Sequence, residues 1–280
     1  MKKIIDTVKR LCIFLAIFIA MQCVCGLLLV LVPLEDTSLS MCISYTLSMV
    51  LTLVFLKLYT SRAIPQMEPI KRSRAGFNPI LLLAGVIFIF ALSIVLSPLE
   101  ELMPVDNSMY DDSVWTLIMV VVIAPIFEEI LFRGKLYNML RISASPLTSV
   151  VLASLLFGAV HLEPIIAISG LPWGLLLGFV YLRSRSIIAP IILHMFNNAL
   201  AYATIVLSYD DKSIVELIDG ERYSLFIYIV SALIVVIAMI RFVTFIVKYG
   251  RQNNNVVVVD TASQESVESG SVESGDEACQ

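Results

Sequence analysis

The sequence is poor in charged residues, and this shortage limits the class of protein. Only 15% of its 280 residues are charged, whereas 59% are hydrophobic, and the mean hydropathy is +0.91. A soluble globular domain carries roughly 25% charged residues. The composition therefore excludes that class and indicates a polytopic membrane protein. No basic patch interleaves with aromatic residues, which argues against a nucleic-acid partner.

Cysteine and histidine are also scarce. The five cysteines are Cys12, Cys23, Cys25, Cys42 and Cys279, and none is spaced with a histidine as metal-ligand pairs are. Three of them lie in the first apolar stretch, where cysteine behaves as a small apolar side chain. Cysteine therefore gives no candidate site. The chain has only two histidines, and both lie within apolar stretches.

Eight apolar stretches have about the length that a membrane-spanning helix needs, which is about 20 residues. They run near residues 11–32, 41–59, 79–97, 114–134, 147–162, 165–182, 187–207 and 223–247. The connecting segments alternate between basic and acidic. By the positive-inside rule this pattern predicts eight crossings with both termini in the cytoplasm. The predicted fold is all-α and multi-pass, with the lipid bilayer as its surroundings.

The sequence changes character after residue 247. From Lys248 onward it is polar and acidic, and it carries the segment Ser-Val-Glu-Ser-Gly twice, at 266–270 and 271–275. Such a composition buries too little apolar surface to fold by itself. We therefore predict a membrane domain over 1–247 and a disordered acidic cytoplasmic tail over 248–280.

The fourth apolar stretch contains two neighbouring acids followed by an arginine. Glu129 and Arg133 are four residues apart, so on a helix they share a face and can pair. Pairing reduces the cost of burying both charges. Glu128 points about 100° away and is free for other work. Pro125, one turn earlier, is expected to kink or restart the helix because it has no N–H.

The two histidines lie on later helices, at depths that match the acids. His161 follows Glu128 by 33 residues, and a polar turn at 141–146 falls midway between them. An antiparallel hairpin about this turn would place the two side chains level. His194 and Asn198 are four residues apart and share a helix face, and Asn197 lies near the same face. The spacing alone does not decide between the two asparagines.

Together these groups are able to hydrolyse a peptide bond without a serine or cysteine nucleophile. Glu128 would act as general base on a water that His161 positions. His194 and Asn198 would donate to the oxyanion of the tetrahedral intermediate. Glu129 and Arg133 would hold the helix and Glu128 in place.

A metal mechanism is the alternative for the same residues. Glu128, His161 and His194 match the ligand set of a catalytic zinc site with two histidines and a glutamate. The sequence has no His-Glu-x-x-His motif, and Glu129 would then have to serve as base. Zinc is therefore a possible cofactor, and no other cofactor is indicated.

The motifs Glu128-Glu129-x-x-x-Arg133, Phe157-x-x-x-His161 and His194-x-x-x-Asn198, in this order, resemble the CPBP family. This family contains CAAX prenyl endopeptidases and the bacterial Abi or bacteriocin-immunity proteins. The resemblance implies an intramembrane endopeptidase with its motif core within 114–207 and a membrane-embedded peptide or protein as substrate. It also implies a multi-pass protein, and the compact chain fits a bacterial plasma membrane.

Two other functions use the same residue pattern. A bacteriocin-immunity protein could bind a toxin or its receptor without turnover. An ion or proton transporter would use intramembrane acids and histidines as relays, although no internal repeat of the kind that transporters carry is visible.

Overall fold

The computed structural model describes residues 1–31, 35–63, 78–103, 111–206 and 224–272, and for Ser224 and residues 253–272 it describes the backbone alone. Within these ranges the chain is helical and contains no strand, which confirms the predicted all-α class. The first three helices are α1 (Lys2–Leu31), α2 (Thr37–Ala63) and α3 (Pro79–Leu102). After a fourth helical segment the chain continues with α7 (Pro146–Ala159), α8 (Pro164–Ser184), α9 (Ile188–Val206) and α11 (Ser224–Val272).

The fourth segment, Val114–Arg141, runs without a break but changes its helical type four times. It consists of α4 (Val114–Ile118), the π-helix η1 (Met119–Ile123), α5 (Ala124–Glu129), the π-helix η2 (Ile130–Leu136) and α6 (Tyr137–Arg141). A π-helix bonds each N–H to the carbonyl five residues earlier, and such turns are frequent at functional sites.

Seven of the eight predicted spans are long and apolar enough to cross a membrane. The eighth, expected over 147–162, is the 14-residue helix α7. At 1.5 Å per residue it is about 21 Å long, shorter than the roughly 30 Å hydrocarbon core. It ends early because the chain turns at Leu162, whose φ is 62°, and Pro164 starts α8. The orientation of the termini stays a prediction.

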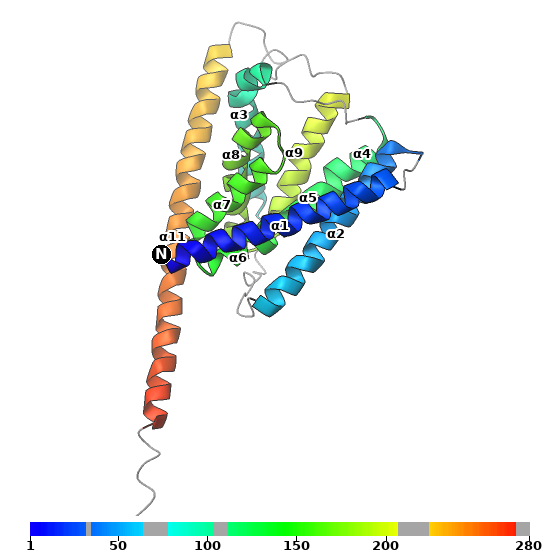
Figure 1. Cartoon of the computed structure of the whole chain (residues 1–280). Helices are drawn as coiled ribbons and strands as arrows, with labels where there is room; N and C mark the ends of the chain where they lie inside the picture. Colours follow the sequence, from blue (N-terminus) through cyan, green and yellow to red (C-terminus); the bar gives the residue numbers. More distant parts are fainter. Residues whose placement is uncertain (32–34, 64–77, 104–110, 207–223, 273–280) are drawn as a thin grey trace, which may run out of the picture.

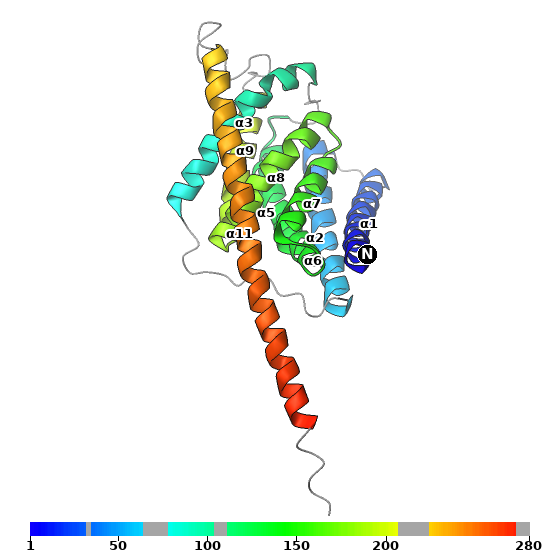
Figure 2. The ribbon, with the colours of Figure 1, turned by 90° about the vertical axis from the view of Figure 1, so that its left-hand side faces the viewer.

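The other helices surround the fourth helical segment, with α5 at its middle (Figure 1). The helices α1 and α2 pack side by side, and α11 contacts α3, α8 and α7. Figure 2 shows α11 running across the face that is turned to the viewer. Between these outer helices, α5 contacts α2 and α9, and η2 contacts α7. The fourth helical segment therefore contacts helices that are far from one another in the sequence.

The helices α7 and α8 pack at backbone contact because glycines face one another. A Cβ added at Gly170 would lie 2.4 Å from the Cα of Gly158, and one added at Gly174 would lie 2.4 Å from the Cβ of Ser154. Neither position has room for a larger residue. The close approach brings the α8 backbone toward the fourth helical segment.

Hydrogen bonds at Asp111 hold the ends of α2 and α9. The Asp111 carboxylate accepts hydrogen bonds from the hydroxyls of Ser38, in the first turn of α2, and Thr116, in α4. The Tyr202 hydroxyl of α9 donates to the Asp111 carbonyl at 2.8 Å. The hydroxyls of Ser38 and then Thr116 hold the pKa of the Asp111 carboxyl below its ordinary value. The 111–116 region thus links three helices.

The helix α11 extends beyond the predicted end of the membrane domain. Where the composition predicts a disordered tail from residue 248, α11 continues as a helix to Val272. Extending a helix that has already formed costs much less than starting one. The predicted boundary at residue 247 therefore falls inside a helix, and residues 273–280 lie outside the described part of the chain.

Candidate active site

The first π-helix exposes one backbone carbonyl toward α9. The Ala124 N–H bonds the Met119 carbonyl, five residues earlier. In the same register the next donor would be Pro125, which has no N–H, so the Val120 carbonyl has no partner in its own helix. Asn198 supplies that partner, because its Nδ2 donates to the Val120 carbonyl at 3.0 Å. The predicted disturbance at Pro125 is therefore a π-turn that anchors a site residue.

Glu128 is buried at the end of α5 and divides its two oxygens between two helices. Its side chain accepts a hydrogen bond at Oε1 from the Tyr45 hydroxyl of α2, at 2.8 Å. The other oxygen, Oε2, lies 3.6 Å from Nε2 of His194. This distance is too long for a hydrogen bond. Oε2 and Nε2 therefore face each other across a short gap.

His194 is 3% exposed and lies between the two acids. Its Nδ1 lies 3.0 Å from Oε1 of Glu129. An ionised carboxylate only accepts hydrogen bonds, so Nδ1 carries the proton of this bond. The imidazole also lies edge-on against the rings of Phe157 and Trp173, at centroid distances of 5.7 and 5.8 Å. These contacts fix the ring so that Nε2 points toward Glu128.

The predicted ion pair between Glu129 and Arg133 is present and fully enclosed. Glu129 is 0% and Arg133 3% exposed, and Arg133 Nη1 lies 2.8 Å from Glu129 Oε1. Arg133 also donates from Nη2 to the Gly174 carbonyl at 3.4 Å and lies 5.2 Å above the Phe157 ring. The same oxygen of Glu129 bonds His194. The pair thus orients His194, a contact that the spacing of the motif did not indicate.

His161 lies in the turn that follows α7 and is half-buried. Its Nδ1 lies 2.7 Å from the Phe157 carbonyl, and its ring packs against the Phe157 ring at 4.9 Å. Since a carbonyl only accepts, Nδ1 is the protonated nitrogen and Nε2 is the acceptor in the neutral ring. Both imidazoles therefore contact Phe157, although no hydrogen bond joins His161 to Glu128 within the described residues.

The two asparagines on α9 have different roles in the structure. Asn197 donates from its Nδ2 to Oδ1 of Asn198 at 3.4 Å. Asn198 accepts this bond and donates one of its two amide hydrogens to Val120, which fixes the orientation of the amide. The second amide hydrogen of Asn198 is not needed for the Val120 bond. Asn198 is therefore the better-anchored donor of the two.

The zinc set predicted from the sequence is not assembled in this arrangement. No three His, Cys, Asp or Glu side chains gather closely enough to hold a metal ion in the part of the chain that is described. Glu128 and His194 face each other and would supply two ligands. A catalytic zinc needs three protein ligands, and within the described residues His161 does not join these two in a group that could hold a metal ion.

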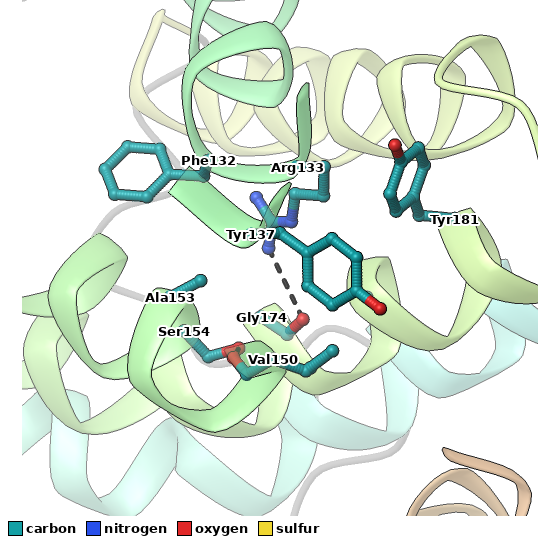
Figure 3. A pocket seen from close by; sticks show the side chains of 9 residues that line it. Phe132, Arg133, Tyr137, Val150, Ala153, Ser154, Gly174 and Tyr181 are labelled. Carbon is teal, nitrogen blue, oxygen red and sulfur yellow. Dashed lines mark hydrogen bonds between the residues drawn. The ribbon is translucent and has the colours of Figure 1, made fainter. Parts of the chain in front are cut away.

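A small cavity lies behind the ion pair, on the side of α8 (Figure 3). Its volume of about 10 Å³ is enough for about one water molecule. Figure 3 shows Arg133 at its edge with the bond to the Gly174 carbonyl, and Ser154, Tyr137 and Tyr181 around it. Glu128 and His194 do not line it. The cavity is a packing gap and not the place where the two acids meet the histidine.

Sequence reasoning missed Tyr45 and Trp173, which contact Glu128 and His194. Tyr45 belongs to the run Ser44-Tyr45-Thr46 within an apolar stretch, and this polar interruption was the available signal. This signal does not identify Glu128 as the partner of Tyr45, however, because α2 precedes the acids by more than 60 residues. Only the packing of α2 against α5 brings them together.

The fold and these contacts define an integral membrane protein of the α-helical class that encloses two acids, an arginine and a histidine in one connected group. Residues 110–200 match the family model described as "Type II CAAX prenyl endopeptidase Rce1-like". This segment is therefore an Rce1-like domain, of the CAAX protease type, and the predicted family is confirmed. It includes all six predicted site residues, whereas Tyr45 lies outside it. No curated protein and no solved structure matches the chain.

Proposed function

We propose that the protein is an intramembrane endopeptidase that hydrolyses a peptide bond in a membrane-associated peptide or protein. The observation that carries this proposal is the pair formed by Glu128 Oε2 and His194 Nε2, 3.6 Å apart and enclosed by helices. Ionisable groups inside a membrane segment are costly and mark functional sites. A carboxylate facing an oriented imidazole is able to move protons during hydrolysis.

In the first step a water attacks the carbonyl carbon of the scissile peptide bond. Glu128 takes one proton from this water as the O–C bond forms, so that the nucleophile is in effect hydroxide. His161 accepts a hydrogen bond from the same water through Nε2, because its Nδ1–H is engaged with the Phe157 carbonyl. The product of this step is a tetrahedral intermediate that carries a negative charge on oxygen.

Two donors on α9 stabilise that oxyanion. The second amide hydrogen of Asn198 is available while the first holds the Val120 carbonyl. The mechanism requires His194 to enter the cycle with protons on both ring nitrogens, so that its Nε2–H, one helical turn away from Asn198, is a second donor and keeps its proton throughout. Donors held in place before the reaction stabilise the developing charge without reorganisation.

The intermediate then collapses and the carbon–nitrogen bond breaks. Glu128 returns its proton to the departing nitrogen, which leaves as an amine, and the other product is a carboxylic acid. The base is regenerated in the ionised form. Throughout the cycle the Arg133–Glu129 pair keeps the His194 ring in one orientation through the bond to Nδ1.

The substrate that we propose first is a peptide with a prenylated CAAX end. The description of the matching family names this activity, and a lipid chain would anchor the peptide at the bilayer in which the site lies. A membrane-embedded peptide without a prenyl group is the other substrate to compare.

The test uses the purified full-length protein in detergent with fluorogenic peptides, prenylated and unprenylated. The variants are Glu128→Gln and, as a matched control, Glu100→Gln, which makes the same change on α3. We expect cleavage by the unchanged protein and the control, and a loss of at least about 100-fold in kcat for Glu128→Gln. Equal activity of Glu128→Gln would contradict the proposal.

The same assay with a zinc chelator separates the two mechanisms. Activity that persists with chelator supports the glutamate and histidine chemistry described above. Activity that disappears with chelator and returns on adding Zn²⁺ supports a metal mechanism. If the unchanged protein cleaves no peptide, and a Glu128→Gln strain keeps the cellular effect of the protein, the function is binding, as in an immunity protein.

A further inference from the structure

We propose that Tyr45 is a positioning residue for the reaction, acting through Glu128 from outside the matched domain. The inference rests on the proposed endopeptidase function. Its basis is the hydrogen bond of 2.8 Å from the Tyr45 hydroxyl to Glu128 Oε1. Tyr45 lies on α2, whereas the family match begins at residue 110.

The bond gives the two oxygens of Glu128 different surroundings. Oε1 accepts the Tyr45 hydrogen, and Oε2 is directed at Nε2 of His194. A glutamate side chain has three rotatable torsions, and its carboxylate could otherwise rotate freely within the site. In a membrane interior there is no bulk water to replace a lost donor. Tyr45 thus selects the oxygen that faces the reaction.

Tyr45 differs in this respect from the hydroxyl residues beside it on α2. Thr46, Ser48 and Thr52 donate to carbonyls of their own helix, at 2.7 to 2.8 Å. Tyr45 is long enough to reach across to α5. A separate contact holds α2 near its start, where Ser38 bonds Asp111, just before the fourth helical segment. Because Ser38 already attaches α2, the bond from Tyr45 is not needed for that attachment, and its effect is to orient the Glu128 carboxylate.

The test is Tyr45→Phe, which removes only the hydroxyl and keeps the ring. We expect kcat for the peptide to fall about 10- to 100-fold, since small errors in placing a catalytic group cost this much, and KM to change less than about threefold. The matched control is Tyr202→Phe, which removes a hydroxyl bond of the same 2.8 Å length from α9 to the Asp111 carbonyl. The control should keep kcat within about threefold.

A second comparison asks whether the effect passes through Glu128. Glu128→Asp shortens the acid so that it no longer reaches Tyr45. In that background Tyr45→Phe should lower kcat by less than about twofold, because residues that act on one group are not additive. Thermal unfolding of every variant separates this effect from loss of the fold, and Tyr45→Phe should unfold within a few degrees of the control.

Four outcomes overturn the inference. Tyr45→Phe with unchanged kcat removes it while leaving the endopeptidase function in place. A kcat loss that is equal in Tyr45→Phe and Tyr202→Phe, or one that persists undiminished in the Glu128→Asp background, assigns Tyr45 a structural role only. An unchanged protein that cleaves nothing overturns the proposed function first, and this inference with it.

Discussion

The buried ion pair between Glu129 and Arg133 leads to a prediction in which stability and activity respond differently to substitution. Replacing Arg133 with methionine keeps most of the side-chain volume but removes the partner of Glu129. Glu129 is 0% exposed and its Oε2 already has no hydrogen-bond partner, so the lost bond cannot be replaced from within the site. Breaking a buried ion pair by removing one member costs about 3–5 kcal/mol.

A cost of this size is large for a single substitution. For a chain of this length it corresponds to a fall in Tm of about 10 °C. The measurement is thermal unfolding of the purified protein in detergent at neutral pH. The decisive comparison is the double variant Arg133→Met with Glu129→Gln, in which no unpaired charge is left buried. We expect it to recover most of the stability, because neutral replacements of buried ion pairs are often neutral or stabilising.

Activity should not recover with stability in the double variant. His194 Nδ1 bonds an oxygen of Glu129 that Arg133 holds in place, and in the double variant this oxygen is neutral and no longer anchored. We expect kcat to stay at least about 10-fold below that of the unchanged protein. A fall in Tm of less than about 2 °C for Arg133→Met, or no recovery in the double variant, would refute the reasoning about the buried charge.

Four further substitutions test other contacts. Asn198→Ala should lower kcat about 100-fold through loss of the oxyanion donor, whereas Asn197→Ala should change it less than about threefold; equal effects would remove the distinction between them. Gly174→Ala should lower Tm by several degrees, since a Cβ there would lie 2.4 Å from an α7 side chain, and an unchanged Tm would show that α7 and α8 separate easily. Asp111→Asn should lower Tm at pH 7, and the difference from the unchanged protein should shrink as the pH falls below about 4. The Asp111 pKa is lowered in the folded state, chiefly by Ser38, so the stabilisation is present above the unfolded value of about 3.9 and is lost as the pH falls through the folded pKa; a difference that is as large at pH 3 as at pH 7 would contradict this.

The sequence predicts the class of fold because the membrane imposes a simple rule on length and polarity. Seven apolar stretches become long helices. The exception is α7, whose largely apolar sequence predicts a full span. Its length is decided at Leu162 and Pro164, where a positive φ and a proline end one helix and begin another. The structure continues α11 to Val272, while the domain boundary at residue 247 and the acidic tail stay predictions.

Within the site, local contacts follow from the sequence and distant ones do not. The Glu129–Arg133 pair lies four residues apart on one segment, so its spacing is sufficient to predict it. The bonds from His194 to Glu129 and from Tyr45 to Glu128 join residues 65 and 83 positions apart. They depend on how α9 and α2 pack around α5. The Asn198 bond depends in addition on a π-turn, which no periodicity in the sequence reveals.

The two π-turns also bear on how chain length can vary during evolution. A π-turn contains one residue more than the α-turn it replaces. Loss of one residue from Met119–Ile123 would convert that turn to α-helix and leave the preceding and following helix faces in the same directions. Loss of one residue from Ala124–Glu129 would instead rotate the acids by about 100° relative to the helix before them. Single-residue insertions and deletions among homologues should therefore collect at the π-turns, while the six residues between them keep a constant length.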